Sequence, residues 1–183
     1  MTAFLRFQDV TLRRGGRLLF ESMDFELAEG EAMHVSGPNG SGKSSLIRLA
    51  AGLLRPERGH VHRASLALAD ENLALDRELP LRRALSFWGG QVDEPMDALG
   101  IAQLADVPVR LLSSGQAKRA MLARLAASPA RLWLLDEPLN ALDAEGADRL
   151  SRLIDGHRAS GGAVLSASHQ PLPGQWRRLE LAR

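Results

Sequence analysis

The sequence predicts an α/β domain with a mostly parallel core sheet, an N-terminal antiparallel β subdomain and an inserted helical subdomain. Three observations carry this prediction. Apolar runs of strand length alternate with helical runs over the second half of the chain, which favours a parallel sheet covered by helices. A glycine-rich turn at 37–42 joins a short apolar run to a helical run. Near the N-terminus, two runs alternate apolar and polar residues as antiparallel strands do.

The N-terminal elements follow from these patterns. Residues 4–12 and 17–27 are predicted strands, joined by a tight turn at Gly15-Gly16 because glycine tolerates the backbone angles of such turns. The next predicted elements are a buried strand at 32–36, a helix at about 43–51 that ends near Gly52, and a turn followed by a strand within 55–63.

The second half of the chain is predicted to be richer in helix. Residues 77–105 have a helical composition interrupted by proline and glycine, which predicts several short helices. The remaining predicted elements are a helix at 114–127, a strand at 131–135, a helix at about 143–158 and a strand at 163–167. We therefore expect a single domain over 1–183, with the inserted helical subdomain at about 70–128.

Composition excludes several classes of site. The chain has 183 residues, of which 45% are hydrophobic and 25% charged, as in ordinary soluble globular domains. The net charge of +1 gives no argument for a nucleic-acid or anionic-membrane surface. The absence of cysteine excludes disulfides, thiolate zinc sites and cysteine nucleophiles. No run of 18 apolar residues and no apolar signal segment occurs, so we expect neither a membrane span nor a secretion signal.

The segment GPNGSGKSS, which starts at Gly37, matches the pattern G-x-x-x-x-G-K-[ST]. Such a loop turns backbone N–H groups around a phosphate, and the following helix adds its positive N-terminus. Lys43 is expected to reach the β- and γ-phosphates, and Ser44 to place its hydroxyl on Mg²⁺. A chance match is less probable because only two of the 23 basic residues are lysines. The residues expected to contact ATP here are Gly37, Pro38, Asn39, Gly40, Ser41, Gly42, Lys43, Ser44 and Ser45.

The apolar strand at 131–135 ends in two adjacent carboxylates, Asp136 and Glu137. Charges at the end of a buried strand are costly unless an opposite charge lies nearby. We expect this strand to lie beside the strand at 32–36, so that its carboxyl end meets the same phosphates. Asp136 would then face Mg²⁺, directly or through water, and Glu137 could polarise a water for attack on the γ-phosphate. The alternative is that the two carboxylates only cap the next helix.

The segment LLSSGQAKRAMLARLAAS at 111–128 predicts a helix with Ser113 or Ser114 as N-cap and Gly115 in its first turn. Such a helix start can bind an anion. Taken alone, the segment is better explained as an ordinary capped amphipathic helix.

The sequence L-S-S-G-Q at 112–116 resembles the L-S-G-G-Q signature of ABC-type ATPases, with serine for the first glycine. The phosphate loop precedes it, and L-L-D-E-P, N-A-L-D at 140–143 and a histidine after a late strand follow it, as in that family. The resemblance covers nearly the whole chain and implies a P-loop NTPase fold of the ABC type that hydrolyses ATP.

The resemblance also assigns roles to the matching residues. The signature residues would contact the ATP held by a second protomer; they are Ser113, Ser114, Gly115 and Gln116. Asp143 would be the loop aspartate that crosses the dimer interface. His169 would be the switch histidine near the γ-phosphate, and would join Glu137 and Lys43 as a catalytic residue. The alternative for His169 is an ordinary surface histidine.

Two positions depart from the family. ABC ATPases often stack adenine on a tyrosine after the first strand, but this chain contains no tyrosine. Arg14 is the candidate in its place, since a guanidinium plane can stack on a π face. The loop glutamine that contacts magnesium in the family has Asn72 as its nearest counterpart. The alternative, that 69–76 is a solvated loop, stays open.

The short chain and the segments LSSGQAKRAMLARL and SHQPL resemble the ATP-binding subunit of the bacterial haem exporter in cytochrome c maturation. That resemblance implies ATP and Mg²⁺ as ligands and a homodimer bound to integral membrane subunits at the cytoplasmic face of the inner membrane. It implies no nucleic-acid partner and no haem ligand in this chain. Alternatives are an ABC ATPase for another transported substrate and, less favoured, a soluble ABC-type ATPase acting on nucleic acid or ribosomes. A small-molecule kinase with the same loop would lack the signature helix.

Overall fold

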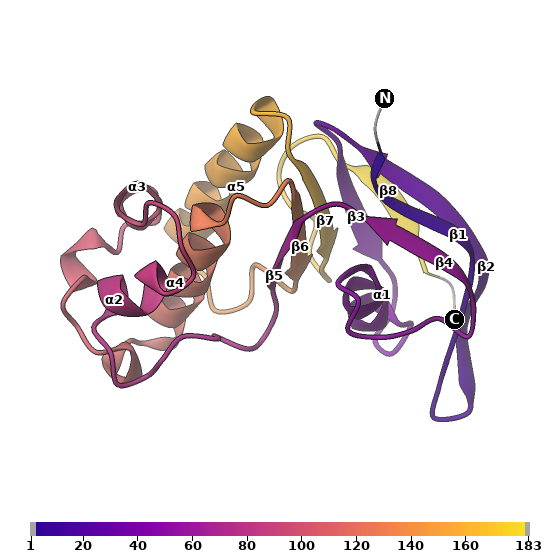
Figure 1. Cartoon of the computed structure of the whole chain (residues 1–183), viewed down its shortest axis with the longest axis horizontal. Helices are drawn as coiled ribbons and strands as arrows, with labels where there is room; N and C mark the ends of the chain where they lie inside the picture. The colour runs from indigo at the N-terminus through magenta and orange to yellow at the C-terminus, as the bar shows by residue number, and fades with distance from the viewer. Residues whose placement is uncertain (1–2, 182–183) are drawn as a thin grey trace. The chain divides into compact units, whose positions relative to one another are not determined.

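The computed structural model describes residues 3–181, and Figure 1 shows its helices and strands. The chain divides into two compact units, and each is described by itself. Within the described residues, the first unit combines 3–68, 130–138 and 157–181, and the second combines 69–129 and 139–156. The second unit thus adds 139–156 to a segment close to the predicted helical insertion. None of the helices described has the length and apolar character that a membrane span requires.

The first unit contains a three-stranded antiparallel sheet with the order β2-β1-β4. Its strands are β1 (Ala3–Arg14), β2 (Arg17–Ala28) and β4 (Arg58–Arg63). The alternating N-terminal pattern therefore predicted β1 and β2 correctly, and the strand predicted within 55–63 corresponds to β4. On the apolar side of the sheet, Phe7 of β1 stacks on Phe25 of β2 with ring centroids 4.5 Å apart, which helps to fix the register.

The second sheet has the order β5-β6-β7-β3-β8. Its strands are β3 (Ala32–Ser36), β5 (Leu66–Ala69), β6 (Leu132–Asp136), β7 (Ala163–Ala167) and β8 (Arg177–Glu180). The pairs β3–β7, β3–β8 and β6–β7 are parallel. The short strands β5 and β8 were not predicted, because each has only four residues and little periodicity.

The prediction that 131–135 lies beside 32–36 is wrong, because β7 separates β6 from β3. All five residues of β7 are buried, which suits a strand with neighbours on both edges. Strand order depends on the packing of the whole sheet, so β6 alone could not specify its neighbour. Because β6, β7 and β3 run parallel, their carboxyl ends still meet at one edge of the sheet.

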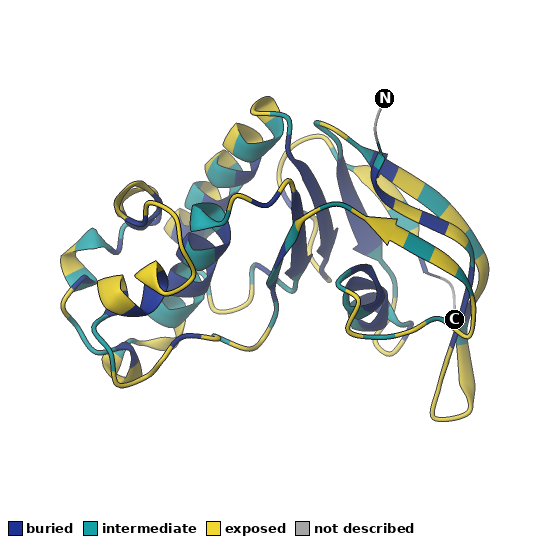
Figure 2. Ribbon diagram, in the orientation of Figure 1, coloured by how far each residue is buried: buried dark blue, intermediate teal, exposed yellow. Residues whose placement is uncertain are grey.

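The helix α1 (Lys43–Ala50) follows the glycine-rich turn and packs its apolar residues into the core of the first unit. Figure 2 shows that β3, β6 and β7 are buried along most of their length. This burial explains why these strands are continuous apolar runs, and it leaves their polar residues at the carboxyl ends.

The second unit is mostly helical. Its helices are α2 (Leu81–Ser86), α3 (Asp93–Ala98), α4 (Ser114–Ala127) and most of α5 (Ala144–Ala159), with 3-10 turns at Ala102–Leu104 and Val109–Leu111. Buried side chains from all of these helices form its core, among them Leu81, Leu85, Met96, Leu122 and Leu150. The interrupted helical pattern and the two longer helices were predicted correctly, to within one or two residues for α4 and α5.

Candidate nucleotide site

The glycine-rich loop connects β3 to α1 in the first unit. A Cβ on Gly37 would lie only 2.7 Å from the carbonyl oxygen of Leu181 and 2.7 Å from Oγ of Ser41, so only glycine fits there. The Ser41 side chain is buried, and its Oγ has no hydrogen-bond partner among the residues described. A tight loop with a buried, unsatisfied hydroxyl is suited to an anion held by backbone and side-chain donors.

Lys43, the first residue of α1, is only 7% exposed. Its Nζ donates hydrogen bonds to the carbonyl oxygens of Gly37, at 2.8 Å, and of Pro38, at 3.2 Å. These bonds hold the ammonium group against the loop itself. The positive charge therefore stands where phosphate oxygens would enter the loop.

Ser44 and Asp136 bring the two sequence motifs together. Ser44 Oγ donates a hydrogen bond to Asp136 Oδ1 at 3.0 Å. A hydroxyl and a carboxylate oxygen this close are a suitable ligand pair for Mg²⁺, which prefers oxygen ligands and leaves further positions to phosphate and water. The helix-capping alternative is wrong for both carboxylates, since α5 begins at Ala144 and Asp143 Oδ1 caps it.

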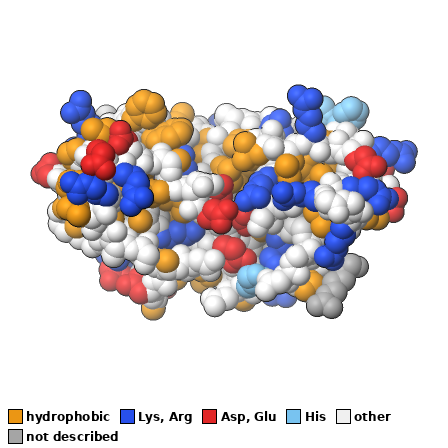
Figure 3. Space-filling view, turned by 90° about the horizontal axis from the view of Figure 1, so that it is seen from below, with side chains coloured by type: hydrophobic (Ala, Val, Ile, Leu, Met, Phe, Trp, Pro, Cys, Tyr) orange, Lys and Arg blue, Asp and Glu red, His pale blue; other side chains and the backbone are white. Residues whose placement is uncertain are grey.

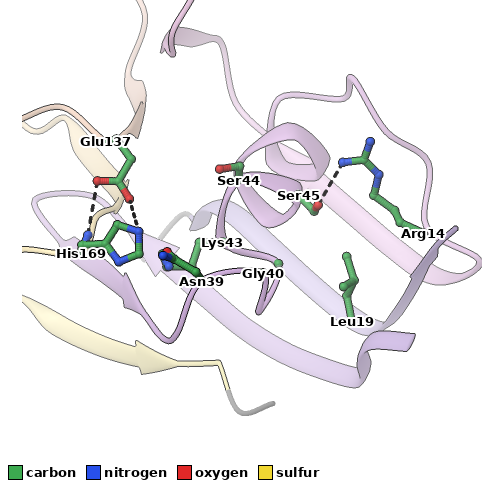
Figure 4. A pocket seen from close by; sticks show the side chains of 10 residues that line it. Arg14, Leu19, Asn39, Gly40, Lys43, Ser44, Ser45, Glu137 and His169 are labelled. Carbon is green, nitrogen blue, oxygen red and sulfur yellow. Dashed lines mark hydrogen bonds and ion pairs between the residues drawn. The ribbon is translucent and has the colours of Figure 1, made fainter. Parts of the chain in front are cut away.

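Glu137 follows β6 with a left-handed backbone, φ 47°. Its backbone N–H donates to the carbonyl of Ala167 at 2.8 Å, which holds this conformation. The carboxylate lies beside His169: the backbone N–H of His169 is 3.4 Å from one oxygen, and Nε2 is 3.4 Å from the other. Figure 4 shows the side chains of Glu137 and His169 facing each other, with Ser44 on the other side of the cavity. Strained residues of this kind cluster at functional sites.

These side chains line a cavity of about 410 Å³ in the first unit, a size that suits a small-molecule ligand. Its lining also includes Arg14, Leu19 and Asn39. Arg14 Nη1 donates to Ser45 Oγ at 3.3 Å, so its guanidinium lies beside the first turn of α1 (Figure 4).

Three residues of this region were not predicted from their sequence context: Leu19, Arg17 and His34. His34 lies in the middle of β3, is 5% exposed, and donates from Nε2 to the carbonyl oxygen of Ser168 at 3.0 Å. That bond fixes the backbone just before His169. The available signal was a lone histidine inside an otherwise apolar strand.

The signature residues lie in the second unit, at the start of α4. Ser113 is the N-cap: its Oγ accepts the Gln116 N–H at 3.3 Å, and the Gln116 side chain accepts the Ser113 N–H at 2.9 Å. This capping box leaves the N–H groups of Ser114 and Gly115 without an intrahelical partner. A Cβ on Gly115 would lie 3.0 Å from the carbonyl oxygen of Ala141, so glycine permits a close approach to the loop before α5.

Asn72 and Asp143 also lie in the second unit and make local contacts. Asn72 is exposed; its side chain donates to Asp70 Oδ2 at 3.1 Å, and its backbone N–H donates to Oδ1 at 2.9 Å. Asp143 accepts the N–H of Gly146 at 2.8 Å. The structure therefore assigns both side chains a local role, and their roles toward a nucleotide stay predictions.

Comparison with known proteins gives a consistent result. The family model described as ABC transporter matches residues 20–140. The cytochrome c biogenesis ATP-binding export protein CcmA of Sphingopyxis alaskensis is 54% identical over 92% of this chain and 91% of its own length. The protein of the same name from Salmonella typhi is 38% identical over 93% of this chain and 91% of its own length.

Solved structures show the same fold. A putative ABC transporter ATP-binding protein from Pyrococcus furiosus superposes with a TM-score of 0.83 at 21% identity, covering 97% of this chain and 96% of the other. An ATP-binding subunit of an ABC transporter gives 0.82 at 21% identity, over 91% of this chain and 79% of the other. Together with the sequence matches, these likenesses lead to one conclusion: the chain belongs to the ABC transporter family of ATPases, within the group of cytochrome c biogenesis ATP-binding export proteins.

Proposed function

We propose that this ATPase is the energy-coupling subunit of a membrane exporter used in cytochrome c biogenesis, with haem as the exported compound. The single observation that carries the catalytic part is the cavity in the first unit, which Lys43, Ser44 and the Glu137–His169 pair line, with Asp136 bonded to Ser44. The biological part rests on the name that relatives up to 54% identical share, and on the resemblance to the haem exporter subunit.

Each side chain in the cavity has a distinct role in the proposed reaction. The loop N–H groups and Lys43 hold the β- and γ-phosphates of ATP. Ser44 and Asp136 would hold Mg²⁺, which neutralises phosphate charge when bound. Glu137 orients the water that attacks the γ-phosphate, and His169 contacts the same phosphate and holds the Glu137 carboxylate in place.

The second unit would complete a nucleotide site of a second copy of the chain. The N–H groups of Ser114 and Gly115 and the hydroxyl of Ser113 stand at the positive end of α4 and can stabilise charge on a γ-phosphate. In a head-to-tail homodimer, Gln116 would keep this helix start in shape and Asp143 would lie at the interface. ATP binding would close the dimer, and hydrolysis would open it.

Two assignments concern the departures from the family. Arg14 lies beside Ser45 and would stack on the adenine ring. Asn72 would take the place of the loop glutamine and link magnesium binding to the membrane partner; it would exchange its contact with Asp70 for that role.

The partners in this proposal are integral membrane subunits of the cytochrome c maturation system. The chain would bind them as a peripheral subunit at the cytoplasmic face of the bacterial inner membrane, where ATP is available. It would have no nucleic-acid partner.

The proposal is tested in a bacterial strain that lacks the gene for this chain. The strain should lose its c-type cytochromes, as seen by haem staining, and the wild-type gene should restore them while the Glu137→Gln gene should not. The chain should pellet with membranes only when its membrane subunits are co-expressed. Normal cytochrome maturation in the deletion strain would rule out the exporter role.

A further inference from the structure

The hairpin between β1 and β2 places two arginines directly opposite each other. Arg14 and Arg17 are paired in the antiparallel register around the turn Gly15-Gly16, whose φ angles are 56° and 80°. Left-handed angles at both turn residues are what a two-residue hairpin needs, so the turn fixes the pairing. Like charges directly opposite each other destabilise a strand pair.

Among the residues that the structure describes, no carboxylate pairs with either arginine to offset this repulsion. Arg14 donates to the neutral hydroxyl of Ser45, and within residues 3–181 the side chain of Arg17 forms neither a hydrogen bond nor an ion pair. Other arginines of the same sheet do have acidic partners: Arg13 lies 3.4 Å from Glu57, Arg6 lies 3.0 Å from Glu26, and Arg58 lies 3.6 Å from Asp9. Figure 3 likewise shows basic and acidic side chains interspersed on the face in view.

The unneutralised pair lies along the phosphate loop. Arg17 Nη1 stands 3.8 Å from the point that a Cβ on Gly40 would occupy. Leu19, on the same face of β2 as Arg17, stands 3.3 Å from the corresponding point on Gly42. The hairpin therefore follows the loop with Arg17 beside its middle and Arg14 beside the first turn of α1.

We propose that Arg17 binds the phosphate chain of the nucleotide, as a second cation opposite Lys43. A guanidinium presents a planar fork of donors that matches phosphate oxygens, and the negative charge of the nucleotide offsets the repulsion between Arg17 and Arg14. The β1–β2 hairpin thus contributes to affinity, while Arg14 serves the base. This inference rests on the proposed nucleotide site.

The test measures dissociation constants of ATP, ADP and adenosine for the full-length chain by calorimetry. The variants are Arg17→Ala, Arg17→Lys, Lys43→Ala and, as matched control, Arg13→Ala, whose arginine is exposed on the same hairpin but faces Glu57. Arg17→Ala should weaken ATP and ADP by about tenfold, as when one charge-assisted hydrogen bond is lost, and leave adenosine unchanged. Arg17→Lys should retain part of the affinity, since it keeps the charge but loses the planar fork of donors.

Two results would overturn the inference: an Arg17→Ala chain that binds ATP like the Arg13→Ala chain, or one that loses adenosine as strongly as ATP. The Lys43→Ala chain separates this inference from the nucleotide site on which it rests. If Lys43→Ala binds ATP normally, the site itself is misassigned. If Lys43→Ala loses ATP and Arg17→Ala does not, the site stands and only the role of Arg17 fails.

Discussion

The two units of this chain use their polar residues in opposite ways. In the first unit, residues far apart in sequence contact one another: Ser44 reaches Asp136, and Glu137 reaches His169. In the second unit, the polar residues singled out by the sequence contact near neighbours. Ser113 bonds Gln116 and Asp143 bonds Gly146, each three residues along the chain.

The first unit therefore has the arrangement of a ligand site, whereas the second unit has only a preformed part of one. The contacts of the first unit gather a cation, oxygen ligands and a carboxylate around one cavity, and the proposed nucleotide site rests on this arrangement. The contacts of the second unit only shape helix starts, so their residues need a ligand held by other groups before they can act.

Glu137→Gln should lower the rate of ATP hydrolysis by about 10²–10⁴-fold while ATP still binds, because the amide cannot act as the general base. Steady-state phosphate release and equilibrium ATP binding give the two readings. The control is Glu145→Gln, which removes an exposed carboxylate that pairs with Arg149, and it should leave turnover unchanged. Normal hydrolysis by the Glu137→Gln chain would mean that another group orients the water.

Mixing two inactive chains should restore hydrolysis if each nucleotide lies between two copies. In a mixed dimer of Lys43→Ala and Ser113→Arg chains, one site has both defects and the other has intact halves. Equal mixing should restore about a quarter of wild-type activity, since half of the dimers are mixed and each has one intact site. A mixture of Lys43→Ala and Glu137→Gln chains is the control, because both changes damage the same half. Absence of recovery in dimers shown to be mixed would contradict the shared site.

Gly115→Ala should lower kcat by about tenfold, because the new Cβ would lie 3.0 Å from the carbonyl oxygen of Ala141 and displace the loop before α5. Its thermal midpoint should change little. Gly156→Ala is the matched control, as its added Cβ meets nothing within 4 Å. Equal kcat values for the two alanine variants would show that the close approach is not needed for turnover.

Asn72 provides a test of coupling in the assembled transporter. If Asn72 acts as the loop glutamine, Asn72→Gln should keep the ATPase activity of the complex, and Asn72→Ala should make it independent of the membrane subunits. Gln91→Ala, another exposed amide of the second unit, should have no effect. Complexes that behave alike with all three changes would leave 69–76 as a solvated loop.

His157 should make the stability of the chain depend weakly on pH. Its ring stacks on Trp133 with centroids 3.8 Å apart, and burial lowers the pKa of the imidazole below the ordinary value of 6.5. As pH falls, the unfolded chain therefore binds the proton before the folded chain does. The contribution of His157 to the free energy of unfolding is fully present above about pH 6.5 and declines below that pH. His157→Gln should reduce the change in the urea unfolding midpoint between about pH 7.5 and 5. The control is His62→Gln, at an exposed position, which should leave that change as it is in the wild-type chain. An unchanged slope in His157→Gln would assign the effect to another group.

Much of the fold could be predicted from local sequence patterns. The hairpin, the phosphate loop with its helix, and the long helices have distinctive periodicity, turns or caps, so their type and limits could be predicted. The order of the strands could not, because β7 enters between β6 and β3 through packing of the whole sheet. Short strands such as β5 and β8 carry too few residues to show a period.

The residues of the candidate site likewise fall into those that local motifs predict and those that they do not. The motifs named Lys43, Ser44 and the two carboxylates, because those residues lie at fixed spacings in one segment each. The place of Arg17 could not be predicted, since its neighbour Gly40 comes from another loop. For His34 the sequence showed only a lone histidine in an apolar strand, and its contact with Ser168 could not be predicted. Contacts made across the fold leave no local pattern.

The backbone of Glu137 sets a conflict between heat resistance and turnover. A left-handed φ of 47° costs a residue with a side chain about 1 kcal/mol, which glycine would not incur. A screen that rewards only thermal tolerance would therefore favour Glu137→Gly, and the surviving variants would have lost the carboxylate that we propose orients the attacking water. Thermostable versions of this ATPase must be selected under simultaneous pressure for hydrolysis, or this position must be held fixed in the library.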